Sequence, residues 1–270
     1  MNKELTQIEF YFPEGDFPDK EAVADAVVDA VEANNSLDHC GYTSKKDLRQ
    51  AMDLFMGHGS IDWYRPITTK EENEIHDIIT NTVEECDEEL SVPTKNFIFV
   101  HPFFPGENTD MFEGVMGVAS YSCVFHLFIN HSNFSKQSLI DTVAHELNHT
   151  IYYYRHYDDF NNRNLLDSVL MEGLAENFKE AFFTSESTPW ASALEEKEAL
   201  NILENSKDLL SSTDDGEIKD FIFGKGEDQK RWMGYSVGYW LVKRFITENP
   251  ELSWDEIMKL DQKEFLKNVI

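Results

Sequence analysis

Residues 142–150 read Thr142-Val-Ala-His145-Glu146-Leu-Asn-His149-Thr150 and contain the pattern H-E-x-x-H. With nine histidines in 270 residues, chance would produce this pattern only about 0.03 times. Apolar residues at helical spacing surround it, namely Leu139, Val143, Ala144, Leu147 and Ile151, so we expect a helix. A spacing of four puts both imidazoles on one helix face, where they can converge on a metal ion. The carboxylate of Glu146 lies just off that face, within reach of a metal-bound water.

A zinc hydrolase needs a third protein ligand and leaves one coordination position open for water. A second apolar helix, expected over residues 164–183, carries Glu172 and Glu176 one turn apart. Carboxylates among so many apolar neighbours are seldom buried unless they are paired or bind a metal. We therefore expect Glu172 to be the third ligand and Glu176 to orient a ligating imidazole by accepting its free ring N–H. Glu176 itself and Asp167, on the same helix, are the alternative ligands.

Taken together, these segments resemble a known group of enzymes. Glu172 follows His149 by 23 positions, and this arrangement resembles the gluzincin metallopeptidases. More closely, the stretches His-Glu-Leu-Asn-His-Thr (145–150) and Leu-Met-Glu-Gly-Leu-Ala-Glu (170–176), with a late Gly-Tyr-x-x-Gly-Tyr (234–239), are similar to the bacterial predicted zinc-dependent proteases of the YjaZ type. The resemblance implies that His145, His149 and Glu172 hold one Zn²⁺ per chain. It also implies that Glu146 is the general base and that Glu176 supports the ligands.

The resemblance further implies a hydrogen-bond donor to the transition-state oxyanion from a later helix. Residues 234–239 resemble the Y-x-x-G of the aminopeptidase branch, which would make Tyr235 that donor. Val237 stands where that branch usually has lysine, and Tyr239 shares the helix face of Tyr235, so the choice between the two tyrosines is open. Gly114–Ser120 matches the edge strand that pairs with the substrate backbone in gluzincins. No counterpart of the aminopeptidase N-terminus-binding motif is visible, which favours endopeptidase over exopeptidase activity.

The hydrophobic pattern of the whole chain indicates an α+β, zincin-like fold. Strands are expected at residues 8–12 and 96–100, with two more within 114–129. Helices are expected at 21–31, at 44–57 and from Thr69, where Thr69 and Glu72 form a capping-box pattern. From residue 135 the pattern is almost wholly helical, with helices expected at 135–155, 164–183, 189–211 and 229–248 and two short segments after Ser253. We therefore expect one catalytic unit over residues 1–270. It would have a mixed lobe (1–134), a helical lobe carrying the metal site (135–270) and an active-site cleft between them.

The charge of the chain excludes several partners. It has 23 Lys+Arg against 51 Asp+Glu, a formal net charge of −28. Such a surface repels phosphate backbones and anionic lipids, so we expect no nucleic-acid and no membrane partner. The sequence has no signal-peptide pattern and no apolar run long enough to span a membrane. Its three cysteines include no C-x-x-C pair, which is typical of reduced thiols and favours a cytoplasmic location.

The expected function is a zinc-dependent peptidase that hydrolyses a peptide or protein substrate. The alternative is a catalytically silent gluzincin-like domain that binds zinc or peptide. A structural zinc domain would need a fourth protein ligand, and none has suitable spacing. His101, His126 and His131 lie around the expected strands, where they either line the cleft or are ordinary strand and loop histidines. The acidic stretches 158–162 and 214–217 lack the ligand period of calcium loops. Substrate specificity, oligomeric state and the cellular metal stay open.

Overall fold

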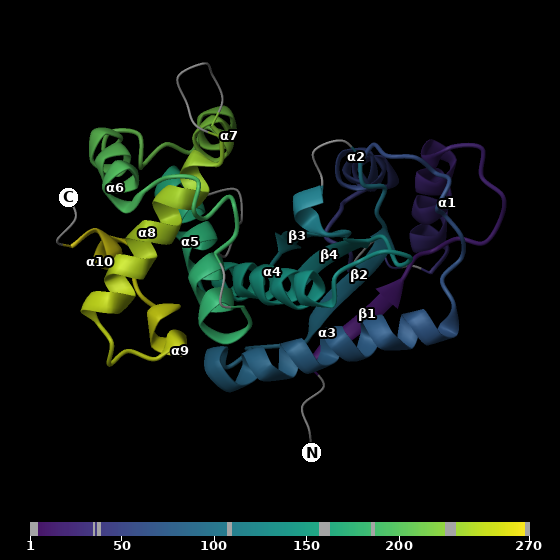
Figure 1. Cartoon of the computed structure of the whole chain (residues 1–270), viewed down its shortest axis with the longest axis horizontal. Helices are drawn as coiled ribbons and strands as arrows, with labels where there is room; N and C mark the ends of the chain where they lie inside the picture. The colour runs from purple at the N-terminus through teal and green to yellow at the C-terminus, as the bar shows by residue number, and fades with distance from the viewer. Residues whose placement is uncertain are drawn as a thin grey trace. The chain divides into compact units, whose positions relative to one another are not determined.

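The computed structural model describes residues 5–34, 36, 39–106, 110–156, 163–184, 187–224 and 231–267 (Figure 1). The chain divides into two compact units. The first contains residues 1–88 and 92–150, and the second contains residues 89–91 and 151–270. The division falls after Thr150, whereas the sequence pattern changes from mixed to helical near residue 134. The boundary in the structure and the boundary in the sequence pattern differ because residues 136–150, although helical, pack on the sheet of the first unit. That residues 1–270 act as one catalytic unit stays a prediction.

The first unit is built around a four-stranded sheet with the order β1-β2-β4-β3. Strands β1, β2 and β4 are parallel, and β3 is antiparallel to β4 at the edge of the sheet. A tight turn with Cys123 at φ 68° joins β3 to β4, which confirms the two strands expected within 114–129. The elements of this unit are β1 (Thr6–Phe10), α1 (Lys20–Ala33), α2 (Lys45–Phe55), α3 (Thr69–Leu90), β2 (Asn96–Pro102), a 3₁₀ turn (Asp110–Phe112), β3 (Val115–Tyr121), β4 (Val124–Ile129) and α4 (Lys136–His156).

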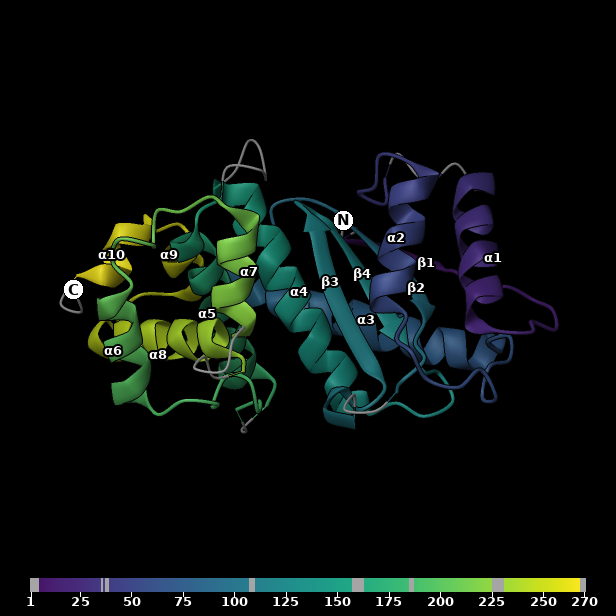
Figure 2. The ribbon, with the colours of Figure 1, turned by 90° about the horizontal axis from the view of Figure 1, so that it is seen from above.

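The two faces of this sheet have different covers. On one face, Phe99 and Phe128 belong to a core cluster with apolar residues of α1 and α2, and Met116 and Val118 of β3 pack against it. Because side chains alternate along a strand, Gly117 faces the opposite side. There α4 approaches so closely that a Cβ at Gly117 would lie 2.7 Å from Cγ2 of Thr142. Figure 2 shows α4 running alongside β3.

Side-chain caps begin the helices of the first unit. Ser44 caps α2 as expected, with its hydroxyl accepting from the backbone N–H of Asp47 at 3.2 Å. The capping box expected from Thr69 and Glu72 is wrong by one residue. Instead, the carboxylate of Glu71 accepts from the N–H of Thr68 at 2.9 Å, and the Thr68 hydroxyl accepts from the N–H of Glu71 at 3.4 Å. The cap is the last residue before the helix, and α3 begins at Thr69. The apolar residues at helical spacing in α3, namely Ile75, Ile78, Ile79 and Val83, are all buried.

The second unit is helical. Its elements are the last turns of α4 together with α5 (Leu165–Phe182), α6 (Glu196–Asn205), α7 (Asp215–Phe223), α8 (Met233–Glu248), α9 (Trp254–Ile257) and α10 (Gln262–Leu266). The most extensive interface of this unit joins α5 to α8. At its centre Gly173 meets Gly238, and a Cβ on Gly173 would lie 2.1 Å from the carbonyl oxygen of Gly238. Only glycine permits backbones this close.

In the helical unit one expected helix is wrong in its bounds and one observed helix was not expected. The helix expected over 189–211 is only α6, since residues 189–194 form turns. The hydroxyl of Ser236 replaces the helical hydrogen bonds there, donating to the Trp190 carbonyl at 2.9 Å and accepting from the N–H of Leu194 at 3.2 Å. Helix α7 was not expected. Its N-cap is Asp214, whose carboxylate accepts from the N–H of Glu217 at 2.9 Å, so this acidic stretch begins a helix. The other acidic stretch, 158–162, lies outside the described residues.

The expected fold class is confirmed: a mixed α+β chain with a sheet in its first half and a mostly helical second half. Helices 135–155, 164–183 and 229–248 are observed as α4, α5 and α8 with small shifts at their ends, and α9 and α10 are the two short segments after Ser253. Across the described part of the chain, no helix is both long and apolar enough to cross a membrane. A zincin-like arrangement with a cleft stays a prediction.

Candidate metal centre

Helix α4 carries the first two candidate ligands. Leu139, Val143, Ala144 and Leu147 are fully buried, so the apolar stripe fixes the rotation of the helix. The rings of His145 and His149 lie on the same face with their centroids 4.5 Å apart and their planes at 80°. His149 is 6% exposed and His145 is partly exposed. The H-E-x-x-H segment therefore presents two imidazoles side by side, as expected.

Helix α5 carries the third candidate ligand, Glu172. One donor atom each from His145, His149 and Glu172 lies within 4.8 Å of the others, so this group could hold a metal ion. Two imidazole nitrogens and one carboxylate oxygen are a donor set that zinc prefers. No fourth histidine, cysteine or acidic ligand joins the group within the described ranges, which leaves a coordination position open.

Asp167, an alternative ligand, has another role in the structure. Its side chain accepts from the N–H of Asn164 at 2.9 Å, and the Asn164 side chain accepts from the N–H of Asp167 at 2.9 Å. This capping box starts α5. The hydroxyl of Tyr152 also lies 3.4 Å from the Asp167 carboxylate. Asp167 thus serves the start of the helix that carries Glu172.

Glu176 lies one turn after Glu172 and is 1% exposed. Its carboxylate accepts hydrogen bonds from the hydroxyl of Thr188 at 2.6 Å and the indole N–H of Trp190 at 2.8 Å. The ammonium of Lys179, 3% exposed, lies 2.8 Å from the same carboxylate. The contacts with Thr188 and Trp190 hold the turns at 187–194 against α5. That Glu176 also orients a ligating imidazole stays a prediction.

Glu146 lies against the edge strand β3. It is 6% exposed, and a Cβ at Gly117 would lie 2.5 Å from its Cγ and 2.8 Å from its Oε1. The absence of a side chain at Gly117 therefore makes the space that the Glu146 carboxylate occupies. From the sequence, Gly117 was expected only as part of the edge strand at Gly114–Ser120. Nothing in a single sequence distinguishes a glycine that makes room for a carboxylate from one that relaxes a strand.

The other edge of β3 is unpaired within the described sheet, because β3 pairs only with β4. Residues 116–120 of this strand are partly exposed. The expected edge strand at Gly114–Ser120 is thus observed as β3, shifted by one residue. An edge strand presents free N–H and C=O groups to which an extended peptide can add.

The two candidate tyrosines of α8 differ in their partners. The hydroxyl of Tyr239 donates to the Glu180 carboxylate at 2.6 Å and accepts from the Lys243 ammonium at 2.5 Å. Lys243 also donates to Glu180 at 2.6 Å, and burial together with Glu180 raises the pKa of Tyr239. Tyr239 is 3% exposed, whereas Tyr235 is partly exposed. The Tyr235 ring packs on Phe223 and Trp232. The Tyr239 hydroxyl is therefore already hydrogen-bonded to Glu180 and Lys243.

The strand histidines lie away from Glu146. His126 pairs in register with Val118, so it is on the sheet face opposite Gly117. The Nε2 of His126 lies 2.7 Å from the Cys40 carbonyl, which can only accept, so Nε2 carries the proton and Nδ1 accepts from Nε2 of His101 at 2.9 Å. Burial lowers the pKa of His126 to about 4, and burial beside His126 lowers the pKa of His101.

His131 follows β4 and is 4% exposed. It packs edge-on against Phe12 and Trp63, and burial lowers its pKa to about 4. In the described residues, His101, His126 and His131 therefore behave as buried strand and loop histidines. None of them joins the candidate ligand group.

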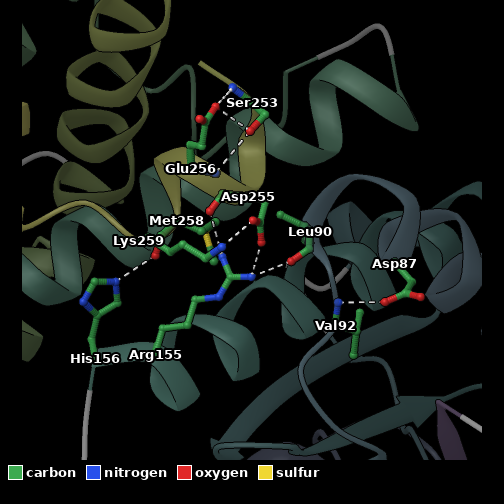
Figure 3. Close-up of polar contacts among 10 residues, drawn as sticks. All are labelled: Asp87, Leu90, Val92, Arg155, His156, Ser253, Asp255, Glu256, Met258 and Lys259. Carbon is green, nitrogen blue, oxygen red and sulfur yellow. Dashed lines mark hydrogen bonds and ion pairs between the residues drawn. The ribbon is translucent and has the colours of Figure 1, made fainter. Parts of the chain in front are cut away.

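The C-terminal end of α4 is anchored by a polar cluster (Figure 3). The Arg155 guanidinium donates to the carbonyl of Leu90 at 2.5 Å, and to the side chain and carbonyl of Asp255 at 2.6 and 3.2 Å. The next residue, His156, places its Nε2 2.9 Å from the carbonyl of Met258. These bonds hold the last turn of α4 to α9. Rotation of the helix that presents the two imidazoles is thereby resisted at this end.

Comparison with known proteins gives one family and one relative. Residues 75–267 match the family model of the DUF2268 group, described as predicted Zn-dependent proteases. The uncharacterized protein YjfC of Bacillus subtilis (strain 168) is 24% identical over 188 residues, which cover 65% of this chain and 62% of YjfC. The chain thus spans under two thirds of the length of YjfC. No solved structure matches the chain. Because the family model covers most of the chain, including both helices that carry the candidate ligands, the chain belongs to the DUF2268 family of predicted Zn-dependent proteases.

Proposed function

We propose that the chain is a gluzincin-type zinc peptidase that hydrolyses peptide bonds with a metal-activated water. His145, His149 and Glu172 would hold one Zn²⁺, Glu146 would be the general base and Tyr235 would stabilise the oxyanion. The observation that carries the proposal is the convergence of the three donor atoms within 4.8 Å. The family membership supports it independently.

Glu146 is suited to proton transfer by its place in the chain. It follows His145 directly on α4, so its carboxylate is held near the ligand face but off it. Zinc held at this centre would supply Lewis acidity, which would lower the pKa of a bound water toward neutrality and polarise the substrate carbonyl. Glu146 accepts the proton of the attacking water and then returns it to the leaving amine. No covalent intermediate with the protein is needed.

The substrate backbone has a natural place beside Glu146. Gly117 of β3 is in contact distance of Glu146, and the free edge of β3 can accept an extended peptide as an added strand. A peptide paired there would run past the general base. Pairing along the backbone does not require a free N-terminus, which supports endopeptidase activity.

Tyr235 is the better candidate for the oxyanion donor within the helical unit. The glycine contact between α5 and α8 joins Gly173, next to Glu172, to Gly238, one turn after Tyr235. Glu172 and Tyr235 are therefore brought to the same crossing of two helices. Tyr239, which faces Glu180 and Lys243, would have to break two hydrogen bonds to serve.

The competing proposal is a silent domain that binds zinc or peptide without turnover. Metal analysis and hydrolysis together separate the two. The chain purified without chelator and reconstituted with zinc should hold about one zinc, and His149→Ala or Glu172→Ala should lose most of it. Asp167→Asn should keep the metal, because Asp167 caps α5. Less than half an equivalent in the unaltered chain would refute the metal site.

Hydrolysis is measured with a mixed library of fluorogenic peptides. Glu146→Gln should retain zinc and lose activity, because an amide of nearly the same volume cannot accept the proton. Glu196→Gln, which changes an exposed glutamate at the start of α6, is the matched control and should behave as the unaltered chain. A zinc-loaded chain without any hydrolysis would support the silent domain, and undiminished activity in Glu146→Gln would remove the general-base role.

A further inference from the structure

The helical unit has a groove that shares none of the candidate metal ligands. Its volume is about 530 Å³, within the range of ligand pockets. The walls come from the start of α5, the segment after α6, and α10. Two backbone bonds fix the first two walls to each other: the N–H of Leu165 donates to Ser212 at 2.9 Å and the N–H of Leu166 donates to Leu210 at 3.0 Å. The groove is therefore part of the folded unit.

The chemistry of the groove is unusual for this chain. Lys207, Lys263 and Lys267 line it and no carboxylate of the described residues does, although the chain carries a net charge of −28. Lys207 and Lys267 each contact a glutamate one turn earlier, but Glu204 and Glu264 are not part of the lining. Exposed ion pairs of this kind contribute little, so the lysines remain available to a partner. Lys263 has no ion pair with any described residue.

The apolar residues that line the groove are aliphatic. Leu166, Leu210 and Leu266 line it, and Leu266 is partly exposed. Gln262 also lines the groove, and its Oε1 is enclosed yet has no hydrogen-bond partner among the described residues. A buried carbonyl oxygen without a partner is costly, and a ligand that donates a hydrogen bond to it removes that cost. A partner should therefore offer carboxylates, an aliphatic side chain and a hydrogen-bonding group.

We infer that this groove binds an acidic peptide segment that carries aliphatic side chains. Its carboxylates would meet the three lysines and its aliphatic side chain would cover the leucines. A peptide backbone has both N–H and C=O groups, so it can satisfy the Gln262 amide whichever way that amide is turned. A fatty acid has no N–H to offer. Charge complementarity and the enclosed amide thus select a peptide.

The test is fluorescence anisotropy with three labelled twelve-residue peptides. One combines Asp and Glu with two leucines, one keeps the acids but replaces the leucines by serine, and one keeps the leucines but replaces the acids by lysine. Measurement at 0.15 M salt limits the reach of remote charges to about 8 Å, so the lysines of the groove act on the peptide more than the distant acidic surface does. The full chain is used without metal, so the result does not depend on hydrolysis.

The acidic leucine peptide should bind best. The triple variant K207Q/K263Q/K267Q should weaken it about tenfold, since each exposed pair contributes modestly. The control K46Q/K197Q/K219Q changes the net charge equally at exposed lysines outside the groove and should bind as the unaltered chain does.

Three results would overturn the inference. The first is no binding, or equal binding by both triple variants. The second is displacement of the acidic leucine peptide by decanoate at a lower concentration than by the unlabelled peptide, which would make the occupant a small amphiphile. The third is self-association in sedimentation that the groove triple variant abolishes, which would make the occupant a second copy of the chain.

Discussion

Replacing Gly238 by alanine tests the close crossing of α5 and α8, which lies next to Glu172 and one turn from Tyr235. A Cβ at Gly238 would lie 2.0 Å from the carbonyl oxygen of Val169 and 3.0 Å from the amide nitrogen of Gly173. Ordinary contact between a carbon and a carbonyl oxygen is over 3 Å, so α5 and α8 must separate by about 1 Å. Both atoms in the way are backbone, so no side-chain rotation relieves the clash.

Two opposing effects set the magnitude. Alanine is favoured over glycine inside a helix by about 1 kcal/mol. Forcing a well-packed contact apart costs about 1–3 kcal/mol, and more where backbone must move. The side-chain amide of Asn177 bridges the same two helices, donating to Gly173 at 2.8 Å and Tyr239 at 2.9 Å, and these bonds would lengthen. The upper end of the packing cost, about 3 kcal/mol, together with about 1 kcal/mol for the two lengthened hydrogen bonds, exceeds the gain from alanine, so we expect Gly238→Ala to lower the free energy of unfolding by about 2–3 kcal/mol.

Thermal unfolding measures the effect directly. For a chain of this size, about 2–3 kcal/mol corresponds to roughly 5–10 °C in Tm. Gly216→Ala is the matched control, because Gly216 is exposed in α7 and its Cβ would approach only the Asp214 carboxylate, at 3.0 Å. That variant should be neutral or slightly stabilising. If Gly238→Ala unfolds at or above the temperature of the unaltered chain, the close contact between α5 and α8 does not require glycine at position 238.

Three further outcomes are expected. Gly117→Ala should displace Glu146 and lower kcat about 10- to 100-fold with zinc retained, and an unchanged kcat in the library assay would contradict the contact. Tyr235→Phe should lower kcat about 100-fold with little change in KM. Tyr239→Phe should lower only the free energy of unfolding, by about 2–3 kcal/mol, and the reverse pattern would move the oxyanion role to Tyr239. In NMR titration, His126 should stay neutral until about pH 4. Because its pKa is about 6.5 when unfolded, its contribution to stability is complete above pH 6.5 and about 2–3 kcal/mol of it is lost by pH 4.5. A titration near pH 6.5 would show that the ring is not enclosed.

Periodic and short-range features of this chain were predictable from its sequence. The buried stripe of α3, the β3–β4 hairpin and the helix with H-E-x-x-H all follow from the spacing of apolar residues, which depends on neighbours within a few positions. The helix expected over 189–211 failed because a distant hydroxyl, Ser236, takes over the backbone of residues 190–194. The capping box of α3 was predicted one residue too late for a more local reason. Two threonines stand in succession, and either can pair with a glutamate three residues later.

The candidate ligands were predictable because their chemistry limits them to a few residue types at helical spacing. What arranges them was not predictable. Gly117, Gly173 and Gly238 act by lacking a side chain, and a sequence does not say which atom occupies the space that a glycine leaves.

Tyr235 and Tyr239 show the same limit for a functional side chain. In the sequence the two tyrosines are equivalent. They lie four residues apart on one helix face, and each directly follows a glycine. The distinction comes from Glu180, 59 positions away from Tyr239, and from Lys243 on the next turn of α8. A hydroxyl that donates to a carboxylate and accepts from an ammonium must give up both bonds before it can stabilise an oxyanion, and each charge-assisted bond is worth about 1.5–3 kcal/mol. An oxyanion donor repays such a loss only in the transition state, so these two hydrogen bonds count against Tyr239 as the catalyst. The position of one acidic residue on α5 thus favours Tyr235 over Tyr239.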